Sequence, residues 1–480
     1  MSQVTHNHSH SLNRFAVIPT AARLNADPSY TGKGVTIAFL DSGFFPHPDI
    51  ADRILAYHDL AAEQVSLDAD APIVPVQWHG TQTSVVAAGD GRLCQGTYCG
   101  LASSSKLVLV KASQQGSITE ENIARGIEWI IENREQYDIR ILNISLGGDQ
   151  DVPCSKSIID QAAERAIENG IAVVAAAGNS GQEGLHSVPP ANSPSVITVG
   201  GYSDNNRLEL EALDLYHSNF GFTADGTLKP EIVAPAMWVA APILPRTEAF
   251  QQAQALQELV AAPDFLLPRL LRELAEDARL PASLRGEDLP TIRRHIEELL
   301  RNLKIVTAHY QHVDGTSFAA PIVSSVIAQM IEANPQLTPG AVKSILISTA
   351  SRIANGAAIR QGYGVLNAAR AVELARTESH ELNVRGCSPP RVENGRLWFI
   401  YHDDYAESVS LAGDFNGWSQ ESLPLSKNEN GLWFIEAQAP RPGHYQYKFV
   451  VNGHRWVDDP SNGMKVLDNY GGLNSLLVLE

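Results

Sequence analysis

The chain contains 480 residues and carries a formal net charge of −18 at pH 7, with a sequence pI of about 5.3. This acidic balance argues against nucleic acid and against an anionic membrane surface as partners, because both repel a negatively charged protein. The length is sufficient for two or three domains with a large core, and no apolar stretch approaches the length of a membrane span.

The chain begins with a leader, predicted over residues 1–30. Residues 1–11 are polar and contain neither the basic region nor the apolar region of a secretory signal peptide. The sequence therefore predicts a cytoplasmic protein.

A buried strand that ends in a carboxylate comes next. Residues 35–43 (VTIAFLDSG) form an apolar run that ends at Asp41, which predicts a parallel strand buried on both faces. Ligands of open α/β sheets bind at the carboxyl edge of such strands, so Asp41 is expected at a binding edge. His79 begins a segment of small and apolar residues, 79–89, which predicts a tightly packed helix.

Two further strands are predicted in the middle of the chain. Residues 141–148 (ILNISLGG) and 173–179 (VVAAAGN) are apolar runs of strand length. The second run ends at Asn179, which places a side-chain amide at the same edge of the sheet.

Residues 315–321 (GTSFAAP) place Ser317 at the start of a helix. Pro321 is expected in the first turn of that helix, where its missing N–H costs little. A hydroxyl at this position lies beside free backbone donors and the positive end of the helix dipole, which favour developing negative charge. Asp, His and Ser at strand and helix ends are what nucleophilic acyl transfer requires.

Together these segments resemble the subtilisin-like serine endopeptidases (subtilases), whose triad runs Asp, His, Ser along the chain. The resemblance implies an α/β fold with a parallel-sheet catalytic domain that hydrolyses peptide bonds. It makes Ser317 the nucleophile and His79 the general base, and Asp41 the group that holds the imidazole in its productive tautomer. Asn179 would donate its amide to the tetrahedral oxyanion, helped by the Ser317 backbone N–H.

The resemblance extends from residue 31 to residue 376, the expected peptidase domain. It makes Ser145, Leu146 and Gly147 the edge that pairs with the substrate backbone, an arrangement that gives affinity through main-chain hydrogen bonds. Two other segments match family landmarks, KPEIVAP at residues 229–235 and GYGVLN at residues 362–367.

Each candidate has a simpler interpretation when taken alone. A single His79 is more often a packed or surface histidine than a base, a single Asp41 more often a cap, and a single Asn179 a turn residue. Their joint occurrence in family order favours the peptidase. A domain of this kind can still keep its triad and lose turnover through a blocked cleft.

The chain departs from the family just before the nucleophile, where a helical insertion is expected over about residues 245–304. Apolar residues at helical spacing predict three helices, over residues 247–260, 268–278 and 289–303. Two interpretations stay equally open. The insertion is either a lid or substrate-selecting arm over the cleft, or a helical hairpin packed on the flank.

Smaller departures concern a side chain, metals and cysteines. Gln82 stands where many subtilases have a second histidine, outside the triad. The chemistry requires no cofactor, and although the family leaves room for a structural calcium ion, no metal-ligating residues are predicted. Cys94 and Cys99 could close a small loop, whereas Cys154 and Cys387 have no evident partner.

Four sparse cysteines in a long chain suit a reducing compartment. About 34 residues precede the first core strand, too few for the folding prodomain of secreted subtilases. We therefore expect an intracellular-type subtilase, or a chain trimmed at its start.

The composition changes after the peptidase domain. Residues 377–390 lack periodicity and predict a linker. Residues 391–480 turn to short alternating strands separated by Asn-Gly turns, which predicts a small all-β sandwich. Its strands are expected over residues 397–401, 408–412, 431–436, 444–451 and 473–479.

Three motifs of this module resemble the early-set glycogen-binding modules, such as that of the AMP-activated kinase β subunit. They are GDFNGW at residues 413–418, YQYKFVVNG at 445–453 and WVDDP at 456–460. In that family indole faces stack on glucose rings while Lys and Asn donate to hydroxyls. The resemblance implies a carbohydrate face made of Trp418, Lys448, Trp456, Tyr470 and Asn474.

The sequence thus predicts a serine endopeptidase with a protein or peptide substrate, targeted to glycogen or another α-glucan by its C-terminal module. One alternative is a protease whose sandwich is a protein-interaction or dimerisation domain, with Trp418 and Trp456 in its core. Another is a glucan-binding scaffold with a silent triad. A carbohydrate-active enzyme is disfavoured, because the module has no evident pair of acids placed for glycosidic cleavage.

Overall fold

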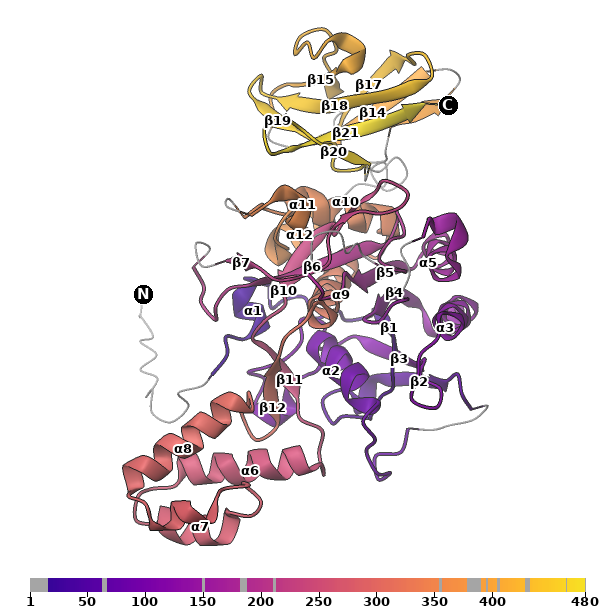
Figure 1. The fold of residues 1–480 in the computed structure, drawn as a ribbon. Coiled ribbons are helices and arrows are strands. Elements are labelled where there is room, and N and C mark those ends of the chain that lie inside the picture. Colours follow the sequence, from indigo (N-terminus) through magenta and orange to yellow (C-terminus); the bar gives the residue numbers. More distant parts are fainter. Residues whose placement is uncertain are drawn as a thin grey trace, which may run out of the picture.

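The computed structural model describes residues 16–62, 67–148, 152–181, 188–209, 213–353, 356–377, 390–393, 396–403, 406–427, 432–462 and 464–479. An α/β domain lies at the centre, with a helical insertion at one end and an all-β module at the opposite end (Figure 1). The predicted fold class is confirmed. The domain limits stay predictions, since the leader up to residue 15 and most of the predicted linker lie outside the described residues.

An eight-stranded sheet has the order β10-β6-β5-β4-β1-β3-β2, with β7 antiparallel to β6 and every other pair parallel. The chain passes from β3 on one side of β1 to β4 on the other, so the carboxyl end of β1 lies where ligands bind in such sheets. The strands are β1 (Thr36–Asp41), β2 (Ile54–Asp59), β3 (Lys106–Lys111), β4 (Ile139–Ile144), β5 (Ala172–Ala176), β6 (Ile197–Ser203), β7 (Asp214–Leu215) and β10 (Ile232–Pro235).

Helices cover both faces of this sheet (Figure 1). In β1, Ile37 and Phe39 pack towards α2 and α9, whereas Ala38 and Leu40 pack towards α3 and α5, which explains why the strand is apolar throughout. One face carries α3 (Glu120–Glu132), α4 (Arg134–Tyr137) and α5 (Ile158–Glu168), and the other carries α2 (Gln77–Ala88), α9 (Thr316–Ala333), α10 (Pro339–Thr349) and α12 (Ala368–Thr377). Short helices α1 (Thr20–Arg23) and α11 (Ala358–Gln361) complete the domain.

Helix α9 lies in the core, packed against one face of the sheet. Among the described residues it is the one helix long and apolar enough to cross a membrane, but 83% of it is buried inside the protein. Packing on every side therefore accounts for its apolar composition.

The three predicted helices of the insertion form, as α6 (Glu248–Ala261), α7 (Leu267–Leu274) and α8 (Leu289–Asn302). They leave and rejoin the domain through an antiparallel pair, β11 (Val239–Pro242) and β12 (Tyr310–Val313). Leu256, Leu271 and Ile296 belong to a hydrophobic core of the insertion's own, and the helices project away from the sheet (Figure 1).

The C-terminal module packs two antiparallel sheets around a core that includes Leu411, Tyr447 and Phe449. One sheet contains β13 (Arg391–Glu393), β14 (Arg396–His402), β17 (Leu432–Gln438) and β16 (Ser426–Lys427). The other contains β15 (Val409–Gly413), β18 (Gly443–Val451), β21 (Leu473–Leu479), β20 (Lys465–Leu467) and β19 (Arg455–Val457). All five predicted strands are present, and the short strands β13, β16, β19 and β20 are additional. A hairpin of β8 (Gly221–Phe222) and β9 (Leu228–Lys229) extends from the α/β domain towards this module.

Candidate active site

Asp41 and His79 are brought together from different elements. Asp41 is the last residue of β1 and is buried, and His79 lies in the first turn of α2. His79 Nδ1 is 2.8 Å from Asp41 Oδ1. The Ser42 amide donates to the same carboxylate oxygen at 2.7 Å, and the Thr83 hydroxyl donates to Oδ2 at 3.2 Å. The carboxylate is thus held in one orientation by three donors.

The Asp41 carboxylate raises the pKa of His79 above its ordinary value, although burial of the ring opposes this effect. A carboxylate at Nδ1 also fixes the neutral ring with its proton on Nδ1, which leaves Nε2 as a proton acceptor. The pair can therefore take up a proton at Nε2 and stabilise the resulting imidazolium.

Ser317 lies in the first turn of α9, after Gly315. Gly315 has φ +138°, a conformation that side chains rarely adopt, and its amide donates to the Ala236 carbonyl at 2.7 Å. The Ser317 hydroxyl donates to the Ser145 carbonyl at a long 3.4 Å, and the structure has no hydrogen bond between Ser317 and His79, both of which it describes. Such contacts are commonly long or absent before substrate binds.

Pro321 was expected in the first turn of its helix, and the structure places it elsewhere. It lies six residues into α9, inside the helix and beyond its first turn. A proline there cannot donate to the carbonyl four residues earlier, which is that of Ser317. That carbonyl instead accepts the Ser145 hydroxyl at 2.9 Å, so the proline leaves a free acceptor that joins Ser317 to the predicted substrate edge.

Asn179 follows β5 and is exposed, with its side chain fixed at one end. The amide and the hydroxyl of Thr316 donate to Asn179 Oδ1 at 2.8 and 3.1 Å, and the Thr316 hydroxyl accepts the Gly178 amide at 3.1 Å. Because Oδ1 is occupied, the Nδ2 group is the end left to act as a donor. The Ser317 amide, in the first helical turn, has no carbonyl partner within the helix.

Two residues of this arrangement were missed in the sequence. Thr83 lies four residues after His79, and thus on the same helical face, and Thr316 directly precedes Ser317. Both spacings were available as signals, but neither residue type indicates by itself a hydrogen bond to Asp41 or Asn179.

The predicted substrate edge, Ser145 to Gly147, continues from the carboxyl end of β4. Ser145 is buried against Ser317, Leu146 is half-buried and Gly147 is exposed. A Cβ on Gly147 would lie 2.7 Å from the Pro189 carbonyl oxygen, so only glycine fits at that position. The exposure of the edge therefore increases from Ser145, beside the nucleophile, to Gly147.

Comparison with known families identifies the domain. The profile described as “Subtilase family” matches residues 32–365, well over half of the 480 residues. The chain belongs to the subtilase family. A second profile, “Carbohydrate-binding module 48 (Isoamylase N-terminal domain)”, matches residues 386–471.

Curated relatives agree with this assignment. “Serine protease AprX” of Bacillus subtilis (strain 168) is 30% identical over 354 residues, which cover 71% of this chain and 67% of AprX. Subtilisin E of the same strain is 33% identical over 183 residues, 37% of this chain and 43% of the relative. The solved structure of “Prenylagaramide maturation protease PagA” aligns with 75% of this chain and 97% of its own at a TM-score of 0.47 and 19% identity. This subtilase is a serine-type endopeptidase with a carbohydrate-binding module.

Four of the five predicted carbohydrate residues of the subtilase lie at the sheet that contains β18. Trp418 and Trp456 have ring centroids 6.2 Å apart. Lys448 Nζ donates to Asp468 at 2.6 Å, and Asn474 Nδ2 donates to Gln446 at 2.8 Å. Trp456 pairs with Val450 of β18, so Trp456, Lys448 and Gln446, the partner of Asn474, lie on one face of that strand.

Tyr470 differs from the other four. It lies in the turn between β20 and β21 and is 95% exposed. Its amide donates to Asp468, the residue that also accepts Lys448. The turn is thus tied to the face, while the ring itself lies in solvent.

The insertion contacts the subtilase domain next to His79. Trp78, adjacent to His79, packs against the insertion's hydrophobic core. Gln82 donates to the Pro242 carbonyl at 3.1 Å, which ties α2 to β11. Gln82, which stands where many subtilases have a second histidine, therefore anchors β11, the strand that leads into the insertion.

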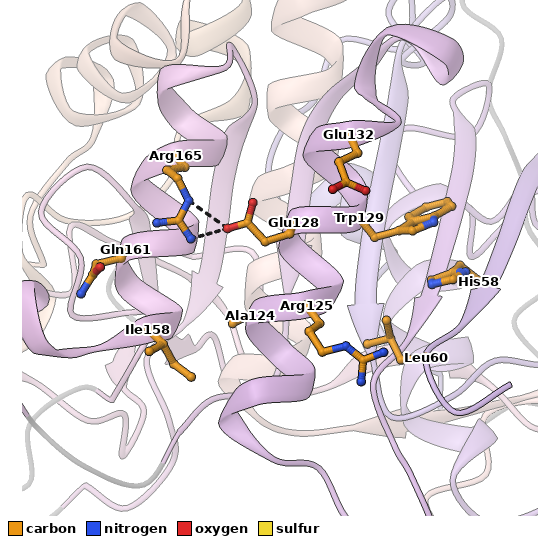
Figure 2. Close-up of a pocket in the computed structure, with 10 residues that line it drawn as sticks. All are labelled: His58, Leu60, Ala124, Arg125, Glu128, Trp129, Glu132, Ile158, Gln161 and Arg165. Carbon is orange, nitrogen blue, oxygen red and sulfur yellow. Dashed lines mark hydrogen bonds and ion pairs between the residues drawn. The ribbon is translucent and has the colours of Figure 1, made fainter. Parts of the chain in front are cut away.

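A pocket of about 410 Å³ lies away from this site, between β2, α3 and α5. Figure 2 shows the side chains that line it, among them Trp129, His58 and the ion pair of Arg165 with Glu128. The rings of His58 and Trp129 stack at 4.4 Å, so His58 covers one face of the indole. None of the predicted site residues lines this pocket.

The cysteines of the described residues lie apart from the predicted site residues. Cys94, Cys99 and Cys154 carry free thiols, and Cys387 lies outside the described residues. The described part of the chain has no cluster of three or more His, Cys, Asp or Glu side chains that could hold a metal.

Proposed function

We propose that this subtilase hydrolyses peptide bonds with Ser317 as nucleophile, His79 as general base and Asp41 as the group that orients the imidazole. Ser317 Oγ attacks the peptide carbonyl carbon while His79 Nε2 takes the hydroxyl proton. The observation that carries the proposal is the 2.8 Å contact between His79 Nδ1 and Asp41, which supports an imidazolium in the transition state.

Asn179 Nδ2 and the Ser317 amide would donate to the oxyanion of the tetrahedral intermediate. His79 then gives its proton to the leaving amine, the C–N bond breaks, and an acyl-enzyme remains on Ser317. Water, deprotonated by His79, hydrolyses that ester and restores the serine. Ser145, Leu146 and Gly147 would hold the substrate backbone during both steps.

Labelling with a fluorophosphonate probe tests this assignment against the silent-triad alternative. Wild-type protein should be labelled and Ser317→Ala should not, with Ser426→Ala as a control at an exposed serine of the module. A wild-type protein that folds and stays unlabelled would make the chain a scaffold.

We further propose that the module binds α-glucan and carries the protease to glycogen-like particles in the cytoplasm, where proteins attached to the polysaccharide would be substrates. The pairing of Trp418 and Trp456 on a face that also holds Lys448 and Asn474 supports this proposal. Trp456 is 39% exposed, which argues against the interpretation of that residue as part of the module's core.

Glycogen co-sedimentation of full-length Ser317→Ala tests the targeting without self-cleavage. Binding should disappear when Trp418→Ala and Trp456→Ala are added. Trp398→Ala is a matched control, because Trp398 stacks on Phe434 in the other sheet. If the parent does not bind although it is folded, the module is an interaction domain.

A further inference from the structure

The C-terminal module is docked on the subtilase domain through the segment between β19 and β20. Arg352 Nη2 donates to Asp458 Oδ1 at 3.1 Å. The Tyr363 hydroxyl lies 3.3 Å from the Asp459 carbonyl and 3.4 Å from the Asn462 carbonyl, within donating distance of both. Two residues of the subtilase domain therefore contact three residues of one module turn.

This contact contains buried charge. Burial opposes the ionisation of Asp458, but Lys465 and Arg352 outweigh it and hold its pKa below the ordinary value. Lys465 also lies 5.3 Å from the centre of the Tyr363 ring. Removing Arg352 takes away the partner that Asp458 has across the interface, while its ion pair with Lys465 at 3.0 Å stays inside the module.

A backbone contact lies beside the charged one. Thr227, directly before β9 in the β8–β9 hairpin, forms an antiparallel bridge with Met464 of the module. The Met464 carbonyl accepts the Leu476 amide of β21 at 2.8 Å. The hairpin is thereby attached to the sheet that carries the carbohydrate face.

The residues at the base of that hairpin hold the loop that contains Asn179. The Asn219 amide donates to the Gly178 carbonyl at 3.1 Å, and Asn219 Oδ1 accepts the Ser180 amide at 2.8 Å. His217 Nδ1 lies 2.7 Å from the Asn179 carbonyl oxygen. The loop is therefore held on the module's side by residues 217–219 and on the nucleophile's side by Thr316.

A second connection runs from Tyr363 to the start of α9. The Tyr363 amide donates to the Glu231 carbonyl at 2.9 Å, and Val365 pairs in parallel with Val233 of β10. Just beyond the end of β10, the Ala236 carbonyl accepts the Gly315 amide at 2.7 Å. The interface is thus joined by hydrogen-bonded backbone to both sides of the oxyanion site.

We infer that the docked module fixes the oxyanion site, and that Arg352 and Tyr363 are positioning residues for catalysis that act through Asn179 and Ser317. The inference rests on the proposed role of Asn179. It makes the module a part of the catalytic unit in addition to a targeting device. A physical connection of this kind becomes a functional one only if breaking it changes turnover, so the test is kinetic.

The test uses the full chain with Arg352→Ala and Tyr363→Phe combined, and measures kcat and KM on a chromogenic peptide amide per active site titrated with a fluorophosphonate. We expect kcat to fall roughly tenfold, less than the ~10²-fold that a 1 Å misplacement costs, with KM little changed. Arg455→Ala is the matched control, because it removes a comparable ion pair with Asp403 inside the module.

The same variants are then measured in an Asn179→Ala background. The loss should be clearly smaller there, since the part that acts through Asn179 is already gone and only the part that acts through Ser317 remains. An unchanged kcat in the wild-type background, or an equal loss in both backgrounds, overturns the inference while the catalytic assignment stands. If Asn179→Ala alone leaves kcat unchanged, the proposed oxyanion role itself is wrong. Tyr363→Phe alone serves if the double variant does not fold.

Discussion

His79 Nδ1 lies 2.8 Å from Asp41 Oδ1, although the two residues are separated by 38 positions and belong to a helix start and a strand end. The carboxylate also accepts the Ser42 amide and the Thr83 hydroxyl, so its position does not depend on the histidine. The acid is therefore built to receive the imidazole in one orientation.

Asp41→Asn should lower kcat about 10⁴-fold, because an amide at this position donates to Nδ1 and forces the proton onto Nε2. The base must be neutral, so kcat/KM of the wild type should fall as the pH drops through the raised pKa of His79. Replacing the Asp41 carboxylate removes the largest cause of the raised His79 pKa. The acid limb of the variant should therefore lie at lower pH, in a profile measured from pH 5 to 9.

Thr83→Val tests the support of the same carboxylate with a milder change. It removes one donor to Asp41 and keeps the side-chain shape, so activity should fall far less than in Asp41→Asn. An Asp41→Asn profile with an unmoved acid limb would contradict the assignment of that limb to His79.

Thr316→Val should lower kcat because it removes the hydroxyl that holds Asn179 Oδ1 and accepts the Gly178 amide. The loss should be smaller than the ~10²–10³-fold that removal of an oxyanion donor causes, since the Thr316 amide still holds Oδ1. Steady-state kinetics on a peptide amide measure it, with Thr316→Ser expected to restore activity. Equal losses for Val and Ser would indicate a packing effect instead.

Tyr470→Ala should weaken glucan binding without a change in stability. The ring is 95% exposed, so it has no packing to lose on truncation. Stacking on a sugar contributes about 0.5–1.5 kcal/mol by analogy with aromatic pairs, which corresponds to roughly a 2- to 13-fold rise in Kd. Calorimetric titration with a linear maltooligosaccharide measures it. An unchanged Kd would exclude Tyr470 from the face.

Long apolar runs made the sheet predictable. Residues 35–41 and 173–175 are buried, and such strands are recognisable because few other structures produce an apolar run that ends abruptly in a polar residue. The short strands β16 and β19, of two and three residues, gave no such signal. They exist because neighbouring strands offer free backbone groups, which is tertiary information.

Sequence motifs identified the candidate site residues, but they did not identify the groups that hold those residues in position. The misplaced Pro321 shows why: the composition of residues 315–321 indicates a helix start, but the residue at which the helix begins depends on Gly315 and its bond to Ala236. The contacts of Asn179 with Thr316 and of Arg352 with Asp458 join segments far apart in the chain. No local pattern contains such pairs.

Replacing residues 251–304 with a short Gly-Ser linker should separate the two interpretations of the insertion. The insertion has its own core, so the triad contacts should persist and hydrolysis of a short peptide should change little. Because it packs on Trp78, next to His79, we expect the cleavage of a folded protein to change more than that of the peptide. Equal results for both substrates would make the insertion a flank element.

Asp160 provides a test of pH-dependent stability. It lies in the first turn of α5, fully buried, and both carboxylate oxygens lack a hydrogen-bond partner in the described structure. Burial raises its pKa to about 7. Between about pH 4 and pH 7 the folded state therefore keeps a proton that the unfolded state has released.

The direction in which stability changes with pH follows from this difference in protonation. The stability that protonated Asp160 contributes is complete below about pH 4 and is lost as the pH rises to about 7, an upper limit on the order of 4 kcal/mol. Asp160→Asn stays neutral, so in a Ser317→Ala background its urea midpoint should exceed that of the parent at pH 8 and approach it at pH 4. Asp277→Asn, on the exposed surface of the insertion, is the control. A parallel shift at both pH values would show that the effect does not come from the titration of Asp160.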